Sequence, residues 1–523
     1  MSGTRTHAGM LRATVQQFPD KDFLTATSTK GEARPVSFAE LEERSRLIAA
    51  GLLERGVRHG DRVAVAAPNQ VEWLELFYGV TRIGAVLVTL NVRYREAELR
   101  YMLNQSGARL VVTSAQSDGF DFVDFYAAFR SEIPDVEDVL FLGDGREDSY
   151  TSLVGDPDTA GLSRHEAEVG ADDPALILYT SGTTGRPKGA VLTHRSMIAA
   201  ASGQVERLGT TTDDVYLCVM PFNHVGGITC SVTAALSTGS TVVLPSAFSP
   251  AGALADIEKH RVSLFAGVPT MWSLMLAHPT FETTDTSTVR LAIIGGSNVE
   301  PTMAAEMLAA FPEARLFNLY GLSESSGASV MSAPDDSVEQ VSSSIGTALT
   351  GIEAKVVGLT GHDVPAGEEG ELHLRGESTT TGYWGRPEEA SQTVLDGGWL
   401  RTGDMVTMDS DGHIHMRGRL KEMFIQGGYN VYPVEVENVL TAHPAVAMAA
   451  GIGVPDAVLG EVGCYYVVLR SGHEVTEEDL RDHCRGQVAD YKVPQQIIVV
   501  DELPTTPSGK IAKASLRKQH DGV

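Results

Sequence analysis

The sequence predicts an α/β protein with a large N-terminal α/β domain of several subdomains with parallel sheets, followed by a small C-terminal α+β domain. The chain has 523 residues. Because single hydrophobic cores stop growing near roughly 250–300 residues, more than one domain is expected. In the middle of the chain, short apolar runs alternate with helix-like segments. This alternation is typical of a parallel sheet covered by helices on both faces.

The predicted strands of the large domain are short apolar runs. They lie at residues 176–179, 241–244, 264–268, 291–294 and 316–319. A helix is expected after Thr193, and another begins at Ser249 and Pro250, because serine is a favoured N-cap and proline fits the first turn. The apolar run at residues 78–90 is short and carries Arg82. We therefore predict a buried element there, not a membrane span.

The sequence changes character after about residue 404. Residues 418–433 contain three glycines and a proline, which predicts a connector. Beyond it, residues 465–469 and 497–500 are predicted strands, and the helix between them begins with a capping-box pattern at Thr476. The final stretch, residues 504–510, is rich in Pro, Thr, Ser and Gly and predicts a loop. We place the two domains at residues 1–419 and 420–523.

Charge and composition exclude several classes of function. Lys and Arg total 41 against 68 Asp and Glu, a net charge of −27. Such a surface repels nucleic acid and anionic membranes, so neither is an expected partner. The first twenty residues lack the apolar core of a signal peptide, which predicts a cytoplasmic protein without a membrane span. The four cysteines have no zinc-site spacing and are expected to be buried thiols.

The strongest local signal is a loop rich in small and hydroxyl residues. Residues 179–189 read Tyr-Thr-Ser-Gly-Thr-Thr-Gly-Arg-Pro-Lys-Gly and follow directly on an apolar run. Many exposed N–H groups and hydroxyls, together with Lys188, are the components of a phosphate-binding loop. The alternative is a flexible surface turn. A Walker A loop is disfavoured, because Pro187 stands where that motif needs glycine.

Further motifs occur in a fixed order along the chain. They are Pro-Phe-Asn-His-Val-Gly at 221–226, Gly-Gly-Ser at 295–297, Asn-Leu-Tyr-Gly-Leu-Ser-Glu at 318–324, Gly-Glu-Leu at 370–372, Gly-Tyr-Trp at 382–384, Arg-Thr-Gly-Asp at 401–404, Gly-Arg-Leu-Lys-Glu at 418–422, Gly-Gly-Tyr-Asn-Val-Tyr-Pro at 427–433 and Pro-Thr-Thr-Pro-Ser-Gly-Lys at 504–510. Together and in this order, they resemble the motifs of the acyl- and aryl-CoA synthetases of the adenylate-forming superfamily. Singly, most of them are weak.

The resemblance implies ATP, Mg²⁺ and coenzyme A as cofactors and assigns the residues that bind them. The β- and γ-phosphates are assigned to Thr180, Ser181, Gly182, Thr183, Thr184 and Lys188. The adenine side is assigned to Gly295, Gly296, Asn318, Tyr320 and Gly321, the α-phosphate to Ser323, and the ribose to Asp404 and Arg419. A carboxylate can accept hydrogen bonds from both ribose hydroxyls. Taken alone, Asp404 would be an ordinary turn residue.

Three residues are implied to be catalytic. Glu324 would hold Mg²⁺, a hard cation that prefers carboxylate oxygen. Lys510 would lie between the attacking carboxylate and the α-phosphate, where an ammonium lowers their repulsion and orients the attack. His224 would border the acyl pocket. Without the resemblance, Lys510 would be a solvated loop lysine and His224 a packed core residue.

The resemblance also implies domain alternation, with a mobile C-terminal domain that pivots at Lys421. One orientation would deliver Lys510 for adenylate formation. The other would bring the loop around Gly427 and Gly428 to the thiol of coenzyme A. A hinge of one or two residues can absorb such a rotation. The alternative is that Lys421 is an ordinary linker lysine.

The expected acyl pocket is apolar. Its nominated residues are Phe222, Val225, Ile228, Val268 and Leu322. Residues 222–229 contain no Asp or Glu to pair with an amino group, and no Lys or Arg for a second carboxylate. The predicted substrate is therefore an aromatic, alicyclic or aliphatic monocarboxylic acid.

The sequence thus predicts an AMP-forming acid–thiol ligase that makes an acyl-adenylate and passes the acyl group to coenzyme A. One alternative is an enzyme of a single half-reaction, which adenylates for a carrier protein or converts a supplied acyl-adenylate. Another is a non-catalytic nucleotide- or acyl-binding protein. Damage to Lys510, Glu324 or the phosphate loop would mark that class, and the sequence keeps all three. A homodimer remains open.

Overall fold

The computed structural model describes residues 5–27, 33–117, 119–143, 149–180, 186–296, 299, 301–505 and 511–521. By its internal packing the chain forms two compact units. The first contains Met1–Ala354 and Leu374–Arg401, and the second Lys355–His373 and Thr402–Val523. The domain boundary predicted between residues 419 and 420 stays a prediction.

The first unit contains a sheet whose central strands are parallel. Across the sheet the order is β17 (Thr347–Ala348), β16 (Gly327–Met331), β15 (Arg315–Leu322), β14 (Leu291–Gly295), β13 (Leu264–Gly267), β11 (Val215–Leu217), β12 (Thr241–Pro245), β1 (Asp22–Thr27) and β2 (Ala33–Ser37). Pairing is parallel from β15 through β1, and antiparallel for β15–β16, β16–β17 and β1–β2. The strands predicted at residues 241–244, 264–268, 291–294 and 316–319 are confirmed.

A second sheet of the first unit is also mainly parallel. Its order is β10 (Lys188–Thr193), β9 (Pro174–Thr180), β4 (Val86–Thr89), β3 (Arg62–Ala66), β5 (Leu110–Ser114) and β8 (Asp138–Leu142). Only the β9–β10 pair of this sheet is antiparallel within the described residues. That pair carries the two ends of the glycine- and threonine-rich loop, so the loop joins neighbouring strands at one edge of the sheet.

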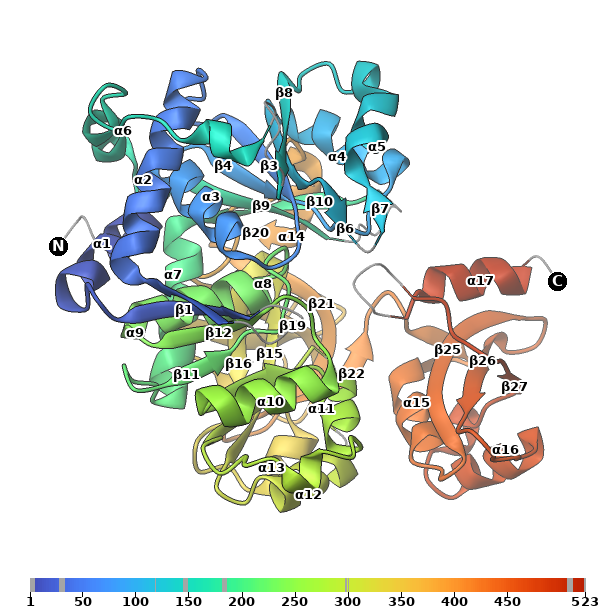
Figure 1. Ribbon diagram of the computed structural model, residues 1–523. Helices are drawn as coiled ribbons and strands as arrows, with labels where there is room; N and C mark the ends of the chain where they lie inside the picture. Colours follow the sequence, from blue (N-terminus) through green and yellow to red (C-terminus); the bar gives the residue numbers. More distant parts are fainter. Residues whose placement is uncertain are drawn as a thin grey trace. The chain divides into compact units, whose positions relative to one another are not determined.

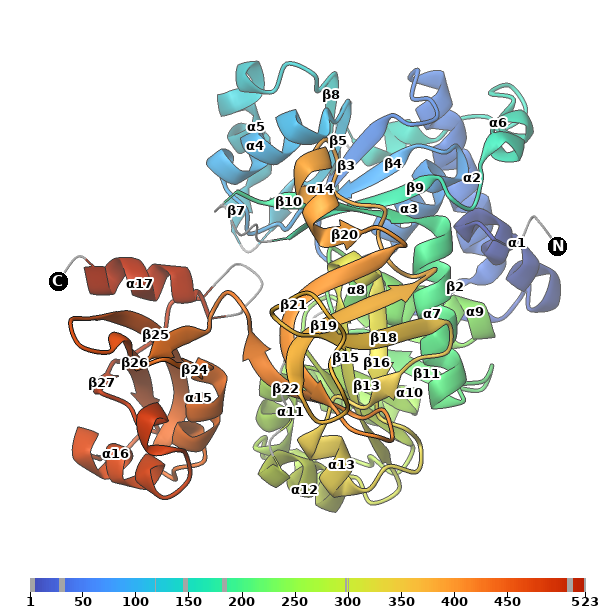
Figure 2. The same cartoon turned by 180° about the vertical axis from the view of Figure 1, so that it is seen from behind.

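Alternate residues of the buried strands face different cores, as the strand period of two requires. Val63 and Val65 of β3 belong to a cluster that also contains residues of the first sheet and of helices α2 (Phe38–Glu54), α3 (Val71–Arg82) and α7 (His194–Leu208). Ala64 and Ala66 face the opposite cluster, with α4 (Glu96–Ser106) and α5 (Phe122–Phe129). These two helices lie beside β5 and β8 in Figure 2.

The first sheet is covered in the same way. Ile293 of β14 faces the shared cluster, whereas Ala292 and Ile294 face α10 (Pro250–His260), α11 (Pro269–Leu276) and α12 (Pro301–Ala310). Figure 1 shows α10 and α11 on this side of the sheet. Parallel sheets covered by helices on both faces are the fold class predicted from the sequence, and the prediction is confirmed.

Two of the predicted helix starts are also confirmed by their capping. Ser249 accepts a hydrogen bond from the Gly252 N–H at the start of α10, and Pro250 occupies the first turn. Thr193 caps α7 and forms a capping box with Ser196. The apolar run at residues 78–90 ends α3 and forms β4, both buried, and the Arg82 guanidinium there pairs with Glu42 and Glu166.

A third sheet has the order β18 (Ile352–Val357), β19 (Glu369–Gly376), β21 (Trp399–Met408) and β20 (Val394–Leu395), and β22 (Ile414–Arg419) pairs with β21. Along the chain, β18 and β21 run from the first unit into the second, and β19 runs from the second unit back into the first. In the part of the chain that the structure describes, no helix combines the length and the apolar character needed to cross a lipid bilayer.

The rest of the second unit is a small α+β fold. Its sheet has the order β24 (Tyr429–Val431), β23 (Phe424–Gln426), β26 (Gly460–Leu469) and β25 (Val446–Asp456), with β27 (Gln496–Val499) paired to β26. Its helices are α15 (Pro433–Thr441), α16 (Glu477–Arg485) and α17 (Lys513–Asp521). The capping box predicted at Thr476 is present at the start of α16.

The predicted connector at residues 418–433 is wrong in part, because it contains a β-hairpin. Strands β23 and β24 pair in antiparallel fashion around Gly427 and Gly428. Both glycines have positive φ, 60° and 89°, which is the conformation that a tight two-residue hairpin turn requires. A Gly-Gly pair between short apolar segments is a hairpin signal as well as a linker signal.

A buried pair of histidines joins the first residues of α1 (His7–Gln17) and α7. The Nδ1 atoms of His7 and His194 are 2.8 Å apart, and the His7 backbone N–H donates to His194 Nδ1. Burial lowers the pKa of His194 to about 4, and burial together with the His194 charge lowers the pKa of His7. Both rings are therefore neutral in the folded protein at neutral pH.

This pair predicts a loss of stability in mild acid. The unfolded chain protonates histidine below a pH of about 6.5, and the folded chain does not, so the free energy of unfolding falls as the pH drops from about 6.5 towards 4. The His194 shift alone corresponds to roughly 3 kcal/mol at 1.36 kcal/mol per pKa unit. Urea unfolding of the protein between pH 7 and 4.5 should show this slope.

His194→Gln should flatten the pH dependence of unfolding, whatever it does to absolute stability. The exposed His362 offers a matched control, and His362→Gln should keep the native slope. An unchanged slope in His194→Gln would contradict the assignment of the pH dependence to the buried, neutral His194.

Candidate active site

The two ends of the predicted phosphate loop are fixed by strand pairing. Thr180 is the last residue of β9, Lys188 is the first of β10, and the two residues are direct partners in the antiparallel register. Ser181, Gly182, Thr183 and Thr184 lie outside the described residues. The predicted ligands Thr180 and Lys188 are thus neighbours at the edge of the second sheet.

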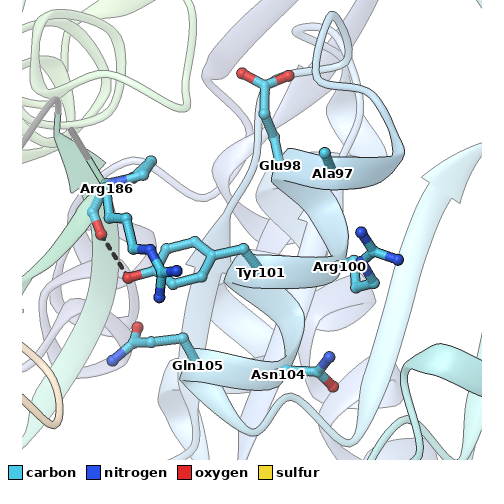
Figure 3. A pocket seen from close by; sticks show the side chains of 8 residues that line it. Ala97, Glu98, Arg100, Tyr101, Asn104, Gln105 and Arg186 are labelled. Carbon is cyan, nitrogen blue, oxygen red and sulfur yellow. Dashed lines mark hydrogen bonds between the residues drawn. The ribbon is translucent and has the colours of Figure 1, made fainter.

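Helix α4 supports the end of this loop. The Tyr101 hydroxyl donates to the Pro187 carbonyl at 3.0 Å, and the Tyr179 hydroxyl donates to Gln105 Oε1 at 2.6 Å. Figure 3 shows Arg186 lying along the Tyr101 ring, on one side of a surface pocket of about 710 Å³. The pocket is lined by Ala97, Glu98, Arg100, Tyr101, Asn104, Gln105, Arg186 and Pro187. Sequence analysis missed this support, because its residues lie in an ordinary amphipathic helix.

The predicted magnesium ligand lies beside the phosphate loop. The Glu324 Oε1 atom is 3.4 Å from Thr180 Oγ1 and accepts a hydrogen bond of 2.9 Å from the Tyr383 hydroxyl. The Lys188 ammonium lies over the Tyr383 ring, 5.3 Å from its centroid, within the range of a cation–π contact. Three residues chosen from two separate motifs, Thr180 and Lys188 from one and Glu324 from the other, are therefore brought together around one tyrosine.

Sequence analysis missed Tyr383 as a site residue, although it lies in the quoted Gly-Tyr-Trp motif. The backbone places it: the Val191 N–H donates to the Gly382 carbonyl at 3.0 Å, and the Trp384 N–H donates to the Gly189 carbonyl at 2.8 Å. Burial and the adjacent Glu324 carboxylate raise the pKa of Tyr383. Tyr383 is therefore a neutral phenol at any physiological pH, and its hydroxyl donates a hydrogen bond to Glu324.

The chain around Glu324 has an unusual backbone. Ser323 and Glu324 belong to a short 3-10 turn, and Ser326 follows with φ of 59°. A left-handed conformation is uncommon for residues other than glycine and costs free energy, so it is found most often where function or packing demands it. Gly321 allows the close approach, since a Cβ there would lie 2.0 Å from the Gly327 carbonyl oxygen.

The predicted adenine-side residues occupy the ends of neighbouring parallel strands. Gly295 ends β14 beside Leu319 of β15, and a Cβ at Gly295 would lie 2.9 Å from the Leu319 carbonyl oxygen. Gly296 has φ of 82°. Tyr320, the predicted stacking residue, lies near the end of β15 and is 9% exposed. Ligands of open α/β sheets bind at such carboxyl ends.

Asn318 uses its amide to fix the local structure. The side-chain NH₂ group donates to the carbonyls of Ser344 at 2.9 Å and Val341 at 3.3 Å. These carbonyls belong to the end of α13 (Val338–Ser343) and the residue after it. Asn318 is 3% exposed. Its contacts therefore position the strand that carries Tyr320, and contact with a nucleotide stays a prediction.

His224 begins a helical segment with an irregular turn. Its Nδ1 accepts a hydrogen bond from the Gly226 N–H at 3.0 Å, so it caps α8 (Val225–Gly227). The next residues, Ile228–Thr233, form a π-helical turn, a feature that is frequent at functional sites. Asn69 holds the preceding chain, because it accepts from the Phe222 N–H and donates to the Met220 carbonyl.

The nominated acyl-pocket residues differ in exposure. Phe222, Val225 and Ile228 are at most 4% exposed and belong to the large apolar core, where Phe222 packs against Trp73. Val268 and Leu322 are half-buried. A Cβ at Gly296 would lie 3.4 Å from Val268, so Val268 adjoins the end of β14. A role for these five residues in binding an acyl group stays a prediction.

The second unit carries the predicted ribose ligands. Asp404 and Arg419 are partners across β21 and β22, and Arg419 Nε lies 2.6 Å from Asp404 Oδ1. The Asp404 side chain is 2% exposed and that of Arg419 is 40% exposed. The structure thus brings these two predicted residues together as an ion pair.

The predicted hinge is an exposed turn. Lys421 lies between the end of β22 and the start of β23, and the N–H groups of Glu422 and Met423 both donate to the Arg419 carbonyl. Gly427 and Gly428 form the exposed tip of the following hairpin. Lys510 lies outside the described residues.

A magnesium ion at this site would need ligands in addition to the protein side chains. Among the described residues, no group of three or more His, Cys, Asp and Glu side chains could hold a metal ion. Glu324 supplies one half-buried carboxylate beside hydroxyl groups. This set fits Mg²⁺, which is often bound by one or two carboxylates together with substrate phosphates and water.

Two family models match the chain. One is described as AMP-binding enzyme and matches residues 11–384, and the other as AMP-binding enzyme C-terminal domain and matches residues 435–510. The chain belongs to this family. It is an AMP-forming acyl-CoA ligase of the adenylate-forming superfamily.

Full-length relatives agree with this assignment. A feruloyl-CoA synthase from an Amycolatopsis species is 36% identical over 497 residues, which cover 94% of this chain and 96% of the relative. The structure of ATP-bound MatB from Rhodopseudomonas palustris has a TM-score of 0.84 and 30% identity, covering 98% of this chain and 99% of that chain. The anthranilate CoA ligase AuaEII with anthranoyl-AMP has a TM-score of 0.85 and 26% identity, covering 98% and 97%.

The contact between Tyr383 and Glu324 predicts a defect in Tyr383→Phe. Phenylalanine keeps the ring beneath Lys188 and removes only the hydrogen bond to the carboxylate. A hydrogen bond to a charged group contributes about 1.5–3 kcal/mol, so kcat/KM for adenylate formation should fall about tenfold or more. Pyrophosphate release, followed across a range of Mg²⁺ concentrations, measures it.

Tyr78→Phe is the matched control, because Tyr78 is also buried and its hydroxyl has no hydrogen-bond partner in the described part of the chain. It should leave the rate unchanged. Equal rates for the native enzyme and Tyr383→Phe would remove Tyr383 from the site.

Proposed function

We propose that this ligase activates an apolar monocarboxylic acid with ATP and Mg²⁺ and transfers the acyl group to coenzyme A. The observation that carries the proposal is the cluster of Thr180, Lys188 and Glu324 around Tyr383. It combines a hydroxyl, an ammonium and a carboxylate at the base of a glycine-rich loop. These are the groups needed to bind a nucleoside triphosphate with its metal ion.

The chemistry requires the α-phosphate to be attacked by a carboxylate. A carboxylate is a poor electrophile, because its leaving group would be oxide. Attack on the α-phosphate forms the acyl–O–P bond, breaks the bond to the β-phosphate and expels pyrophosphate, and the acyl group then has AMP as its leaving group. In our proposal Lys188 and the N–H groups of the phosphate loop neutralise charge on the departing phosphates.

Lys510 and His224 complete the proposed mechanism. The Lys510 ammonium reduces the repulsion between two anions as they meet, which is a contribution made mainly in the transition state. His224 caps α8 at the start of the helical segment that carries Val225 and Ile228. We place the acyl group beside this segment, with the thiol attacking the acyl carbon and AMP leaving.

The proposed substrate class rests on the side chains around His224. The five nominated side chains are apolar: Phe222, Val225, Ile228, Val268 and Leu322. Residues 222–229 contain no Asp, Glu, Lys or Arg, and His224 is their one ionisable side chain. An amino group would find no carboxylate, and a second carboxylate no Lys or Arg, among them, which would be costly in an apolar pocket. Relatives named for feruloyl and anthranilate groups support an aromatic ring as one acceptable acyl group.

The two half-reactions need different groups, and we propose that domains 1–419 and 420–523 rotate about Lys421 between them. Lys421 itself is exposed, between the half-buried Leu420 and Glu422, and a short turn of this kind can absorb the change in backbone angles at a hinge. Gly427 and Gly428, at the tip of the β23–β24 hairpin, would then border the pantetheine chain of coenzyme A.

Mass spectrometry tests the whole reaction. The protein, ATP and Mg²⁺ are incubated with a panel of aromatic, alicyclic, aliphatic, dicarboxylic and amino acids, with and without coenzyme A. We expect acyl-CoA from one apolar class, and the corresponding acyl-adenylate when coenzyme A is left out. Products from an amino acid or dicarboxylate alone would contradict the substrate class. Thioester formed only from a supplied acyl-adenylate would contradict adenylation by this chain.

Lys510→Ala tests the catalytic lysine. A charge contact made mainly in the transition state is worth about a hundredfold or more in rate. The variant should therefore lose adenylate formation by about that factor, with unfolding by urea unchanged and conversion of a supplied acyl-adenylate to thioester retained. Adenylate formation by Lys510→Ala at the native rate would contradict the mechanism.

A further inference from the structure

Another lysine of the C-terminal stretch, Lys513, is held by two carboxylates. Lys513 Nζ lies 2.7 Å from Glu422 Oε2 and 2.8 Å from Glu437 Oε1. The side chains of Lys513, Glu422 and Glu437 are 19%, 29% and 14% exposed. The Gly451 N–H of β25 also donates to Glu437 Oε1, at 2.6 Å. The ammonium is therefore fixed by two carboxylates from different segments of the second unit, one of which is itself held by β25.

The position of Lys513 is poor for the stability of its own helix. It is the first residue of α17, and no acidic residue lies in the first turn. The helix dipole favours negative charge at a helix N-terminus and disfavours a cation there. A buried position also disfavours an ammonium, yet the carboxylates of Glu437 and Glu422 raise the pKa of Lys513 overall. The two ion pairs, and not helix propensity, explain a lysine at this place.

The partners of Lys513 connect two functional segments. Glu422 directly follows Lys421 in the turn between β22 and β23. On the other side, Ile511 forms a backbone bridge with Thr505, and the Ala512 N–H donates to the Pro504 carbonyl at 2.8 Å. Both ends of the 504–510 segment are thus tied to each other, and Lys513 ties its C-terminal end to the residue next to the proposed hinge.

We propose that Lys513 is a positioning residue for Lys510. Its ion pairs with Glu422 and Glu437 make the start of α17, the turn after Lys421 and α15 one rigid body. Rotation about Lys421 then carries Lys510 to a defined place. The inference rests on the proposed function, in which Lys510 acts in adenylate formation and is not needed for thioester formation.

Apolar packing also anchors α17, independently of Lys513. Leu516 of α17 is 1% exposed and packs in an apolar cluster with Ile452, Val454 and Leu503. This packing keeps α17 in place when Lys513 is replaced. Loss of the ion pairs would therefore loosen the start of the helix, where precision matters, because a misplacement of about 1 Å can cost about a hundredfold in rate.

The test compares both half-reactions in Lys513→Met. We expect kcat for adenylate formation to fall about tenfold or more, with KM for ATP and for the acid within about twofold of native. Conversion of a supplied acyl-adenylate and coenzyme A to thioester should stay within about twofold. Lys513→Arg, which keeps a cation able to reach both carboxylates, should recover most of the adenylation rate.

The second unit offers a matched control in Lys492. It pairs with Glu435 Oε2 at 2.6 Å, and its side chain is 19% exposed, as is that of Lys513. Lys492→Met removes an ion pair of similar burial away from the 504–510 segment and should leave both half-reactions unchanged. If Lys513→Met and Lys492→Met lowered both half-reactions equally, Lys513 would be merely structural and the proposal overturned.

Glu422→Gln gives a milder second variant, because Lys513 keeps its bond to Glu437. It should lower adenylation less than Lys513→Met, and the double variant should be no worse than Lys513→Met alone, since both act through one contact. Additive effects would overturn the proposal. Lys510→Ala, measured in parallel, shows which proposal is wrong. If Lys510→Ala loses adenylation while Lys513→Met keeps it, only the role of Lys513 is contradicted. If Lys510→Ala keeps adenylation, both the proposed function of Lys510 and the role of Lys513 are contradicted.

Discussion

The geometry of the candidate site depends on the backbone pairing of residues 382–384 with β10. These main-chain hydrogen bonds join Gly382 and Trp384 to Val191 and Gly189. The Thr380 hydroxyl adds a bond to the Val191 carbonyl, 189 residues away along the chain. The pairing places Tyr383 where its hydroxyl reaches Glu324 and its ring reaches Lys188. In the proposed function, a carboxylate for the metal ion and an ammonium for phosphate are thus set at one spacing by rigid structure, which favours catalysis by positioning.

The contacts of each buried or half-buried cation indicate whether its charge is used within the protein or is available to a ligand. Arg82 and Lys513 are each held by two carboxylates, so their charge is used inside the protein. Lys188 contacts the face of an aromatic ring, which orients an ammonium without cancelling its charge. In a chain with a net charge of −27, a triphosphate is repelled by most of the surface. In the proposed function, the ammonium held by the ring, at the end of a loop sequence rich in Gly, Ser and Thr, provides a local exception.

Local patterns in the sequence predicted the parallel strands, the capped helix starts and the loop between Thr180 and Lys188, because each depends on residues close together in the chain. Tyr383 was missed because its importance arises from a tertiary contact with Glu324, which no spacing reveals. For the same reason the sequence did not show that Asn318 holds the end of α13, or that Lys513 pairs with Glu422 and Glu437. The hairpin at Gly427 and Gly428 was predicted as a connector, since a glycine pair suits a linker and a tight turn equally well.

The groups of the two units are fixed in different ways. In the first unit, Lys188 begins β10 and is placed by pairing with β9, and Tyr383, which contacts Lys188 and Glu324, is placed by backbone hydrogen bonds to β10. In the second unit, α17 is anchored by side chains: Leu516 is buried, Lys513 pairs with Glu422 and Glu437, and His520 Nδ1 lies 3.2 Å from the Tyr466 hydroxyl. Long side chains that form ion pairs can span the gap between a helix start and a turn. In the proposed rotation, which would bring Lys510 into place, rigidity within the moving body matters more than strength at the hinge, because a flexible body would lose the orientation that the hinge delivers.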